Sequence, residues 1–430
     1  MMLHAGSSLS DWLTWLETLS AKEIDLGLDR VQSVLDRLSL EIPANVLLIA
    51  GTNGKGSSVA MIQALLSAAG YRVGTYTSPH VIRYNERIAV GGVPASDEQI
   101  IAAFGRVEAA RHDVPLTYFE YGTLAAMVVF GTANLDVWVL EVGMGGRLDA
   151  TNVIDPSASL ITNVSLDHCA WLGEDIETIA TEKAGVMREG APTVFASRDV
   201  PRSLRQHADT IGAELLLVGR DFDFERGADG DWSWTGREVS RDSLKPPGLH
   251  GDFQLGNAAG VLALIEAAGL NKALDRPLLN RVLPDLTLAG RLQALRVAGA
   301  DWLLDVAHNA AAATVLAETL AATQVAGNTW AIIGLLDDKD AEGIAAPLNS
   351  QVDYWIAVTA NSPRAVPAEE LARRIANACG RPCRIADSLD DAMQYARRGA
   401  SKNDRILVTG SFYLVGPTLL NLELYSRPES

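Results

Sequence analysis

Cysteine is scarce in this chain, which has only three in 430 residues, at positions 169, 379 and 383. Their odd number and their spacing fit neither a disulfide framework nor a zinc site. Because disulfides are rare in reducing compartments, the cysteine content favours a protein of the cytoplasm. The opening segment MMLHAGSSLSDWLTWLETL also lacks a basic stretch followed by an apolar core, so it does not resemble a secretory signal.

Long apolar runs and clusters of basic residues are missing too. No apolar stretch reaches the roughly 18 residues that a membrane-spanning helix needs. Lysine and arginine number 36 against 53 aspartates and glutamates, for a formal net charge of −17. Nucleic-acid-binding surfaces concentrate positive charge, so we expect neither a nucleic-acid nor a membrane partner. The chain is 48% hydrophobic, and its length suits two or three domains with large cores.

A glycine-rich loop stands between a predicted strand and a predicted helix. The apolar residues 46–50 lead into GTNGKGSS at 51–58, and a helical pattern follows. Such a turn directs backbone N–H groups and the positive end of a helix dipole at phosphate oxygens. The loop departs from the strict P-loop pattern, because Ile49 replaces its first glycine and Gly56 replaces the Ser or Thr after the lysine.

We predict that this loop binds the phosphates of ATP, with Lys55 on the β- and γ-phosphates. The alternative, a purely structural turn, would explain the glycines at 51 and 54 but not a lysine between two glycines. The other predicted phosphate contacts are the backbone N–H groups of Asn53, Gly54 and Gly56 and the hydroxyl of Ser57 or Ser58.

Strand-like and helical runs alternate in two blocks, which meet near residues 284–290. The predicted strands are Tyr71–Tyr76, Val137–Glu141, Leu160–Val164 and Thr193–Phe195, then Trp302–Val306, Trp330–Ile333, Tyr354–Val358 and Ile406–Val408. The predicted helices are Asp97–Ala110, Glu120–Phe130, Ile176–Met187 and Asn257–Ala268, then Ala310–Ala322, Ala368–Cys379 and Leu389–Arg397. Residues 219–245 are short, polar and aromatic, as in small antiparallel hairpins.

This alternation predicts an α/β protein of two domains. Residues 1–288 would form an N-terminal P-loop nucleotide-binding domain with a mostly parallel sheet. Residues 289–430 would form a smaller, Rossmann-like α/β domain, of an ordinary domain size.

Polar residues follow several of the predicted strands. Glu141 ends an apolar strand, where a carboxylate is costly to bury without a partner. Mg²⁺ arriving with ATP is one candidate partner, and Arg147 is the alternative. His168 follows another strand end, where open α/β sheets bind ligands, although a single histidine is more often structural. Lys183 lies in an apolar helical stretch, and its periodicity alone predicts a surface residue with its amine in water.

Other motifs are weak when taken singly. The Ser78–Pro79 pair is a common start for a turn. Residues such as Asn257, Arg291 and Asp305 fit ordinary capping or turn roles equally well. Together with the glycine loop, however, these three offer a purine contact, a cation for the triphosphate and a carboxylate for the ribose.

With these motifs in order, the sequence resembles the folylpolyglutamate synthases of the Mur ligase superfamily, in the bacterial form that is also a dihydrofolate synthase. The resemblance spans almost the whole chain. Its segments are IDLGLDRV (24–31), AGTNGKGSS (50–58), TSPH (77–80), NERI (85–88), LTYFEYGTLAA (116–126), LEVGMGGRLDATN (140–152), SLDH (165–168), EKAGV (182–186), HGDFQLGNAA (250–259), GRLQ (290–293), DVAHNAAA (305–312), DDKD (337–340), PRA (363–365) and GSFYLVG (410–416).

The resemblance implies an ATP-dependent ligase that joins L-glutamate to dihydropteroate and to reduced folates through an acyl phosphate. It also implies Mg²⁺, expected as two ions, and a monomer. Two alternatives stay open: a Mur-type ligase that acts on another acid, and a non-catalytic ATP-binding module. Mur-type peptidoglycan ligases carry a separate domain ahead of the loop, whereas only fifty residues precede Gly51 here.

The resemblance also assigns roles to residues. Lys55, His168 and Lys183 would be catalytic, and Lys183 matches a lysine that is carbamylated in the family, which revises its predicted surface position. Ser78, Glu141 and His168 would bind the metal. ATP would contact Asn53, Gly54, Lys55, Gly56, Ser57, Asn257, Arg291 and Asp305. The pteroate pocket would contain Asp25, Thr117, Tyr118, Phe119, Glu120, Leu148, Asp149 and Ala150, and glutamate would contact His308 and Ser411.

Overall fold

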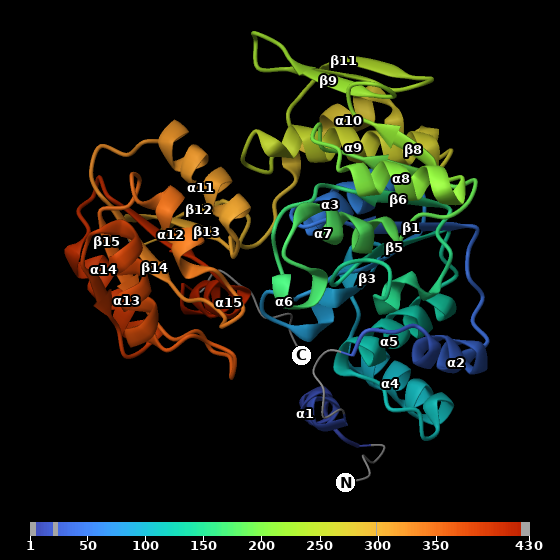
Figure 1. The fold of residues 1–430 in the computed structure, drawn as a ribbon, viewed down its shortest axis with the longest axis horizontal. Helices are drawn as coiled ribbons and strands as arrows, with labels where there is room; N and C mark the ends of the chain where they lie inside the picture. The colour runs from blue at the N-terminus through green and yellow to red at the C-terminus, as the bar shows by residue number, and fades with distance from the viewer. Residues whose placement is uncertain (1–5, 20–24, 298, 423–430) are drawn as a thin grey trace. The chain divides into compact units, whose positions relative to one another are not determined.

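The computed structural model describes residues 6–19, 25–297 and 299–422, and it divides the chain into two compact units (Figure 1). The first unit comprises residues 1–164, 174–248 and 254–286, and the second comprises residues 165–173, 249–253 and 287–430, within the described ranges. The second unit therefore includes two short segments from the first half of the chain. Ile24, the first residue of the 24–31 motif, lies outside the described residues.

The first unit is built on an eight-stranded sheet in the order β4-β3-β2-β5-β1-β6-β7-β8. Its strands are β1 (Asn45–Ala50), β2 (Val73–Tyr76), β3 (Ile88–Val90), β4 (Val93–Pro94), β5 (Val137–Glu141), β6 (Ala158–Ile161), β7 (Pro192–Phe195) and β8 (Glu214–Leu217). The six strands β2, β5, β1, β6, β7 and β8 pair in parallel with their neighbours in the sheet. Strands β3 and β4 extend the sheet beyond β2 as an antiparallel edge. Residues 46–50 are apolar without alternation because β1 is central and buried on both faces.

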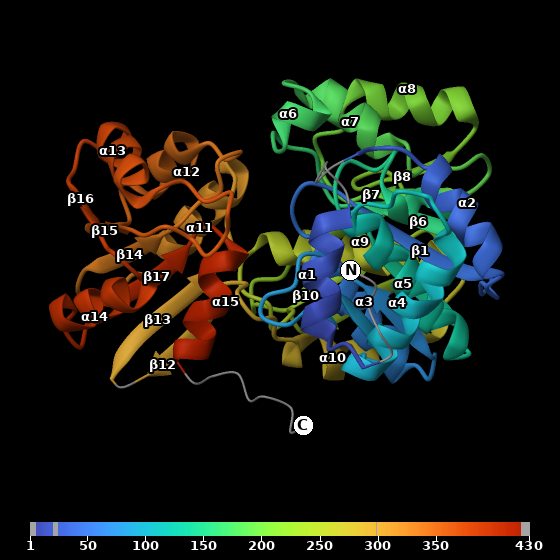
Figure 2. The ribbon, with the colours of Figure 1, turned by 90° about the horizontal axis from the view of Figure 1, so that it is seen from below.

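Helices lie on both sides of this sheet. Figure 2 shows α7 and α8 above strands β6 to β8 and α3 and α10 below β1. The α-helices of this unit are α1 (Leu9–Leu19), α2 (Asp29–Leu38), α3 (Lys55–Ala68), α4 (Asp97–Arg111), α5 (Tyr118–Thr132), α7 (Ile176–Ala184), α8 (Arg202–Ile211), α9 (Phe253–Ala267) and α10 (Arg276–Val282). Short 3-10 helices add Tyr84–Arg87, Ala150–Val153, Asn271–Leu274 and Leu283–Asp285.

A separate antiparallel sheet confirms the predicted hairpins. It consists of β9 (Asp223–Arg226), β10 (Trp232–Thr235) and β11 (Ser240–Leu244), with β10 in the middle. Trp232 and Trp234 alternate with polar residues along β10 and are fully buried. This alternation explains the aromatic and polar texture of the segment.

The second unit has a six-stranded sheet in the order β12-β13-β17-β14-β15-β16, parallel except for β12. Its strands are β12 (Gln293–Val297), β13 (Ala300–Asp305), β14 (Thr329–Ile333), β15 (Tyr354–Ala357), β16 (Cys383–Ile385) and β17 (Arg405–Thr409). Its helices are α6 (Cys169–Leu172), α11 (Ala310–Ala322), α12 (Ala341–Leu348), α13 (Ala368–Cys379), α14 (Leu389–Gly399) and α15 (Phe412–Asn421). The predicted fold class, two α/β units with mostly parallel sheets, is therefore confirmed.

Some predicted boundaries were wrong, for local reasons. The strand predicted at Leu160–Val164 ends at Ile161, because Thr162 and the following residue bind the glycine loop instead. The helix predicted to reach Met187 ends at Ala184, followed by Gly185, where a side chain would meet Arg147. Helices α12 and α15 escaped prediction because each contains a proline in its last turns, which usually indicates a break.

Across the described ranges, every helix is too short or too polar to cross a bilayer.

Candidate functional site

The glycine loop joins the central strand of the first unit to the start of a helix. β1 ends at Ala50, and α3 begins at Lys55. Gly54 occupies the N-cap position with φ of +88°, a conformation that glycine adopts without strain. Because the first N–H groups of a helix have no partner within it, the first turn of α3 presents backbone donors at this point.

Residues after β6 hold the loop in shape. The carbonyl oxygen of Asn53 accepts hydrogen bonds from Thr162 Oγ1 at 2.6 Å and Asn163 Nδ2 at 2.8 Å. A Cβ atom on Gly51 would lie 1.9 Å from Thr162 Oγ1, so the loop can pass this close to the strand only with glycine there. The N–H of Asn53, predicted to bind phosphate, donates to Asn163 Oδ1 at 3.1 Å. In this structure that donor braces the loop.

Lys55 extends back over its own loop. Its Nζ donates to the carbonyl oxygens of Gly51 at 3.0 Å and Thr52 at 3.2 Å. The charge therefore lies beside the N–H groups of the first helical turn. This combination of a point charge and aligned N–H donors suits the phosphates of a nucleotide.

The structure brings Asn257 to the loop from two hundred residues away. A Cβ atom on Gly54 would lie 2.7 Å from Asn257 Oδ1, so the two residues are in close contact. Asn257 donates to Gln254 Oε1 at 2.9 Å, and Gln254 donates to Ser57 Oγ at 3.4 Å. Sequence reasoning missed Gln254. Its only signal was its position three residues, about one helical turn, before Asn257 on α9.

Glu141 and Ser78 lie together at the same end of the sheet. Glu141 ends β5 opposite Ile49 of β1, and only 4% of it is exposed. Its Oε2 accepts a hydrogen bond from the backbone N–H of Ser78 at 3.3 Å. Arg147, the alternative partner, forms its ion pair with Glu182 at 2.7 Å.

These side chains fit a magnesium ion that also binds phosphate. A hydroxyl and a carboxylate are hard oxygen donors, which Mg²⁺ prefers. No group of three or more histidine, cysteine, aspartate or glutamate side chains within the described ranges could hold a metal. Mg²⁺ commonly needs only one or two carboxylates, because water and substrate phosphates complete its coordination.

The surface position predicted for Lys183 from periodicity is wrong. Lys183 is only 3% exposed. It lies four residues after Ile179 and three after Ala180, and all three belong to the buried face of α7. The prediction failed because periodicity assigns charged residues to the exposed face of a helix, whereas the buried face of this short helix includes Lys183.

The residues predicted to bind pteroate gather around the start of α5. Thr117 caps this helix. The carboxylate of Glu120 accepts a hydrogen bond from the backbone N–H of Thr117 at 2.7 Å, which completes a capping box. Arg30, which sequence reasoning missed, forms ion pairs with Glu120 at 2.9 Å and Asp25 at 3.1 Å. Tyr118, between the capping residues, contacts the ring of Tyr84 edge-on.

A second group lies at the loop after β5. A Cβ atom on Gly143 would meet Phe119 at 2.5 Å and Asp149 at 3.2 Å, so these side chains lie side by side. Burial raises the pKa of Asp149, although hydrogen bonds from Thr151 and from the N–H of Met144 oppose this. The neighbouring predicted residues are Leu148, which is half-buried, and Ala150, which is buried.

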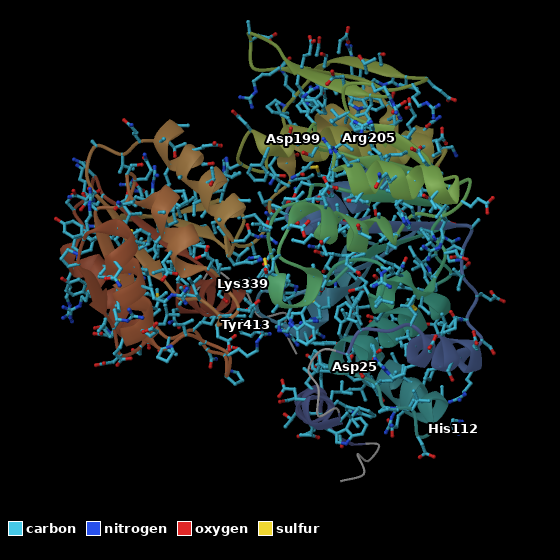
Figure 3. The ribbon with its side chains drawn as sticks, viewed as in Figure 1. Asp25, His112, Asp199, Arg205, Lys339 and Tyr413 are labelled. Carbon is cyan, nitrogen blue, oxygen red and sulfur yellow. The ribbon has the colours of Figure 1, made fainter. Side chains whose placement is uncertain are left out.

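Four predicted residues of the second unit converge on α15. The guanidinium of Arg291 lies 5.2 Å from the ring of Phe412, and the ring of His308 lies 6.3 Å from it. Ser411 caps α15, because its hydroxyl accepts a hydrogen bond from the backbone N–H of Tyr413 at 3.1 Å. Tyr413 is labelled in Figure 3. Asp305 is near Arg291, whose charge opposes the rise in the pKa of Asp305 that burial causes. The Asp305 carboxylate accepts backbone N–H groups on both oxygens, at 2.8 Å each.

A further polar network, which sequence reasoning did not assemble, lies in the second unit. It centres on an ion pair of 2.7 Å between Asp167 and Lys339, whose side chains are each 7% exposed. We call it the Asp167 network, and it consists of Asp167, His168, His308, Asn309, Asp338, Lys339 and Arg364. The segments SLDH, DVAHN, DDKD and PRA supply these residues, but their spacing gives no sign that they meet.

The charges of the network are balanced against each other. Burial alone would raise the pKa of Asp167, but the hydrogen bond from His308 and the charge of Lys339 hold it well below its usual range. Burial opposes ionisation of Asp338 as well, yet His168, Lys339 and Arg364 together lower its pKa. Both carboxylates are therefore ionised near neutral pH.

Comparisons with known families match both halves of the chain. The model of the Mur ligase middle domain matches residues 49–264. The model of the Mur ligase glutamate ligase domain matches residues 290–412. The dihydrofolate synthase/folylpolyglutamate synthase of Escherichia coli strain K12 is 39% identical over 416 residues, which cover 96% of this chain and 95% of that protein.

Solved structures agree with these matches. E. coli FolC in complex with DHPP and ADP superimposes with a TM-score of 0.91 at 38% identity, covering 98% of this chain and 99% of that one. A bifunctional folylpolyglutamate synthase/dihydrofolate synthase from Yersinia pestis, complexed with AMPPNP and a Mn ion, gives a TM-score of 0.89 at 38% identity, covering 98% and 100%. The chain therefore belongs to the Mur ligase family and, within it, to the bifunctional dihydrofolate synthase/folylpolyglutamate synthases.

Proposed function

We propose that this chain is an ATP-dependent ligase that joins L-glutamate to dihydropteroate and to reduced folates. One observation carries the proposal. The loop between β1 and α3 has phosphate-binding geometry, in a chain that matches a dihydrofolate synthase/folylpolyglutamate synthase over 96% of its length. The Mur ligase glutamate ligase domain match at residues 290–412 supports glutamate as the amine substrate.

The chemistry needs two steps. A carboxylate is a poor acyl donor at neutral pH, so the carboxylate oxygen first attacks the γ-phosphorus of ATP, and ADP leaves. The amino nitrogen of glutamate then attacks the carbonyl carbon of the acyl phosphate, loses a proton and expels inorganic phosphate. The chain contributes mainly by positioning the reactants and stabilising charge.

Several of the predicted residues have roles in binding ATP under this proposal. Lys55 neutralises the β- and γ-phosphates, and the N–H groups of Gly54 and Gly56 bind their oxygens. Asn53 and Ser57 keep the loop in the binding shape, as their hydrogen bonds to Asn163 and Gln254 support. The remaining nucleotide contacts are Asn257, Arg291 and Asp305.

Ser78, Glu141 and His168 would hold Mg²⁺, of which we expect two ions. Mg²⁺ supplies charge neutralisation on the phosphates. Lys183 would be carbamylated and present a carboxylate-like group near the metal. The burial of Lys183 on α7 supports this modification, because an unmodified lysine normally extends its amine into water.

The organic substrates would use two other groups of residues. Asp25, Thr117–Glu120 and Leu148–Ala150 would bind pteroate, and the aromatic rings of Tyr118 and Phe119 suit a flat heterocycle. His308 and Ser411 would bind glutamate. We further propose a monomer that works in the cytoplasm with small molecules as its only partners, and the unpaired thiols of the three cysteines support that location.

A coupled assay of ADP formation tests the proposal. Dihydropteroate and tetrahydrofolate are each offered with ATP and Mg²⁺, with and without L-glutamate. The expected result is ADP formation with either acid, dependent on glutamate. ADP formation only with another acid would indicate a different Mur-type ligase, and none with any acid would indicate a binding module.

A further inference from the structure

His168 has an unusual backbone for its residue type. Its φ is +50°, in the left-handed region that residues with a side chain rarely adopt. Such conformations persist only where the surroundings enforce them, and they cluster at functional sites. The segment 165–173 that carries His168 is grouped with the second unit, so the enforcing contacts are found there.

Asp167 fixes the main chain at this point. Its Oδ1 accepts the backbone N–H of His168 at 2.8 Å. The same carboxylate is held by Lys339 Nζ at 2.7 Å and by Asn309 Nδ2 at 3.0 Å. Two different loops of the second unit, after β13 and after β14, therefore restrain the residue that precedes His168.

Asp338 contacts the ring of His168. Its Oδ2 lies 3.5 Å from Nδ1, whereas the other ring nitrogen, Nε2, lies farther from a carboxylate, at 4.0 Å from Asp167 Oδ1. Asp338 is itself fixed, because Lys339 lies 3.2 Å from Oδ2 and Arg364 donates to Oδ1 at 3.0 Å. A carboxylate on one ring nitrogen keeps a proton there and leaves the lone pair of the other nitrogen to a ligand.

We propose that Asp338 is a positioning residue that orients His168 to present Nε2 to the divalent cation, and that Lys339 and Arg364 hold Asp338 in place. Histidines that bind metals commonly donate their other ring N–H to a carboxylate in this way. The inference rests on the metal-binding role that we propose for His168, and it adds a residue to which no metal role has been assigned above.

The test measures metal binding directly. Mn²⁺ binding to the full chain in the presence of AMPPNP is followed by electron paramagnetic resonance, for the wild type and for Asp338→Asn. We expect the Kd for Mn²⁺ to rise by roughly 10- to 100-fold, the usual effect of removing an outer carboxylate. The matched control is Asp387→Asn, an exposed aspartate of the same unit, which should bind Mn²⁺ as the wild type does.

A double-mutant comparison separates positioning from a general structural effect. If Asp338 acts through His168, Asp338→Asn adds no further loss in a His168→Ala background. An equal loss in both backgrounds would overturn the proposal, as would wild-type Mn²⁺ affinity in a folded Asp338→Asn protein. If Asp338→Asn does not fold, Arg364→Gln loosens the same carboxylate, and unchanged Mn²⁺ binding there overturns the proposal equally.

Mn²⁺ binding by His168→Ala alone tests the metal-binding role of His168 on which this inference rests. If His168→Ala itself binds Mn²⁺ as tightly as the wild type, His168 is not a metal ligand, and the proposed metal site is wrong. If His168→Ala weakens Mn²⁺ binding but Asp338→Asn does not, only the positioning role of Asp338 is wrong.

Discussion

The glycine loop of the first unit and the Asp167 network of the second unit are built in opposite ways. The phosphate-binding groups of the loop are local, because residues 51–58, including Lys55, and the start of α3 supply them, although distant residues brace the loop. The network is assembled from four separate segments, and its two aspartates are neutralised by Lys339 and Arg364. The comparison shows why one site can be found from a short stretch of sequence while the other needs the fold.

The largest predicted effect on activity follows from removing the positive charge of Lys55 from the loop. Lys55→Ala should lower the rate of ADP formation by at least about 100-fold, since losing one preorganised electrostatic contact to a reacting group costs that much. Circular dichroism checks that the fold survives the loss of the hydrogen bonds from Lys55 to the carbonyl oxygens of its own loop. The matched control, Lys402→Ala, changes an exposed lysine and should keep the activity. Full activity in Lys55→Ala would refute the phosphate-binding role.

The second unit should respond to the loss of its lysine in stability. Lys339→Met leaves buried Asp167 and half-buried Asp338 without their shared cation, and breaking a buried ion pair such as Asp167–Lys339 costs about 3–5 kcal/mol. Urea denaturation measures the free energy of unfolding, with exposed Lys272→Met as the control. If both variants lose the same small amount, the network does not stabilise the unit.

A third prediction concerns the carboxylate beside the loop. Glu141→Gln should raise the Mg²⁺ concentration for half-maximal ADP formation by at least about tenfold, because an amide keeps the shape but loses the charge that attracts the ion. An unchanged magnesium titration would count against Glu141 as a metal ligand.

The smallest predicted effect tests whether the first unit also contains a network of side chains. Arg30→Met removes the ion pairs to Asp25 and Glu120, and a hydrogen bond to a charged group contributes about 1.5–3 kcal/mol. Because Arg30 orients two residues that we propose to bind pteroate, the KM for dihydropteroate should rise severalfold, with a smaller change in kcat. Arg37→Met, on the exposed side of the same helix, should leave both constants unchanged.

The sequence was most informative where chemistry and local geometry coincide. The strand, loop and helix around Lys55 were predictable because glycine, lysine and the apolar run each require a particular backbone. The approach of Asn257 and Gln254 to that loop could not be read from the residues, since it depends on the fold bringing the first turns of α9 to the start of α3.

Lys183 shows the limit of periodicity. The position of a lysine on a short helix cannot be decided when both faces are partly apolar, and packing placed it inside. In the sequence, Asp338 and Arg364 are distinguished only by their places in the DDKD and PRA segments. Their hydrogen bond depends on β14 and β15 being neighbours in the sheet. Charges that are balanced in the fold therefore look like ordinary solvated residues in the sequence.

The central claim is that the first turn of α3 and Lys55 hold the triphosphate. The most direct measurement is a crystal structure of the full chain with AMPPNP and Mn²⁺. The account predicts the γ-phosphate at the N-terminus of α3, within hydrogen-bond distance of Lys55 Nζ. A nucleotide bound elsewhere, with the loop at residues 51–58 making no contact with phosphate, would contradict it.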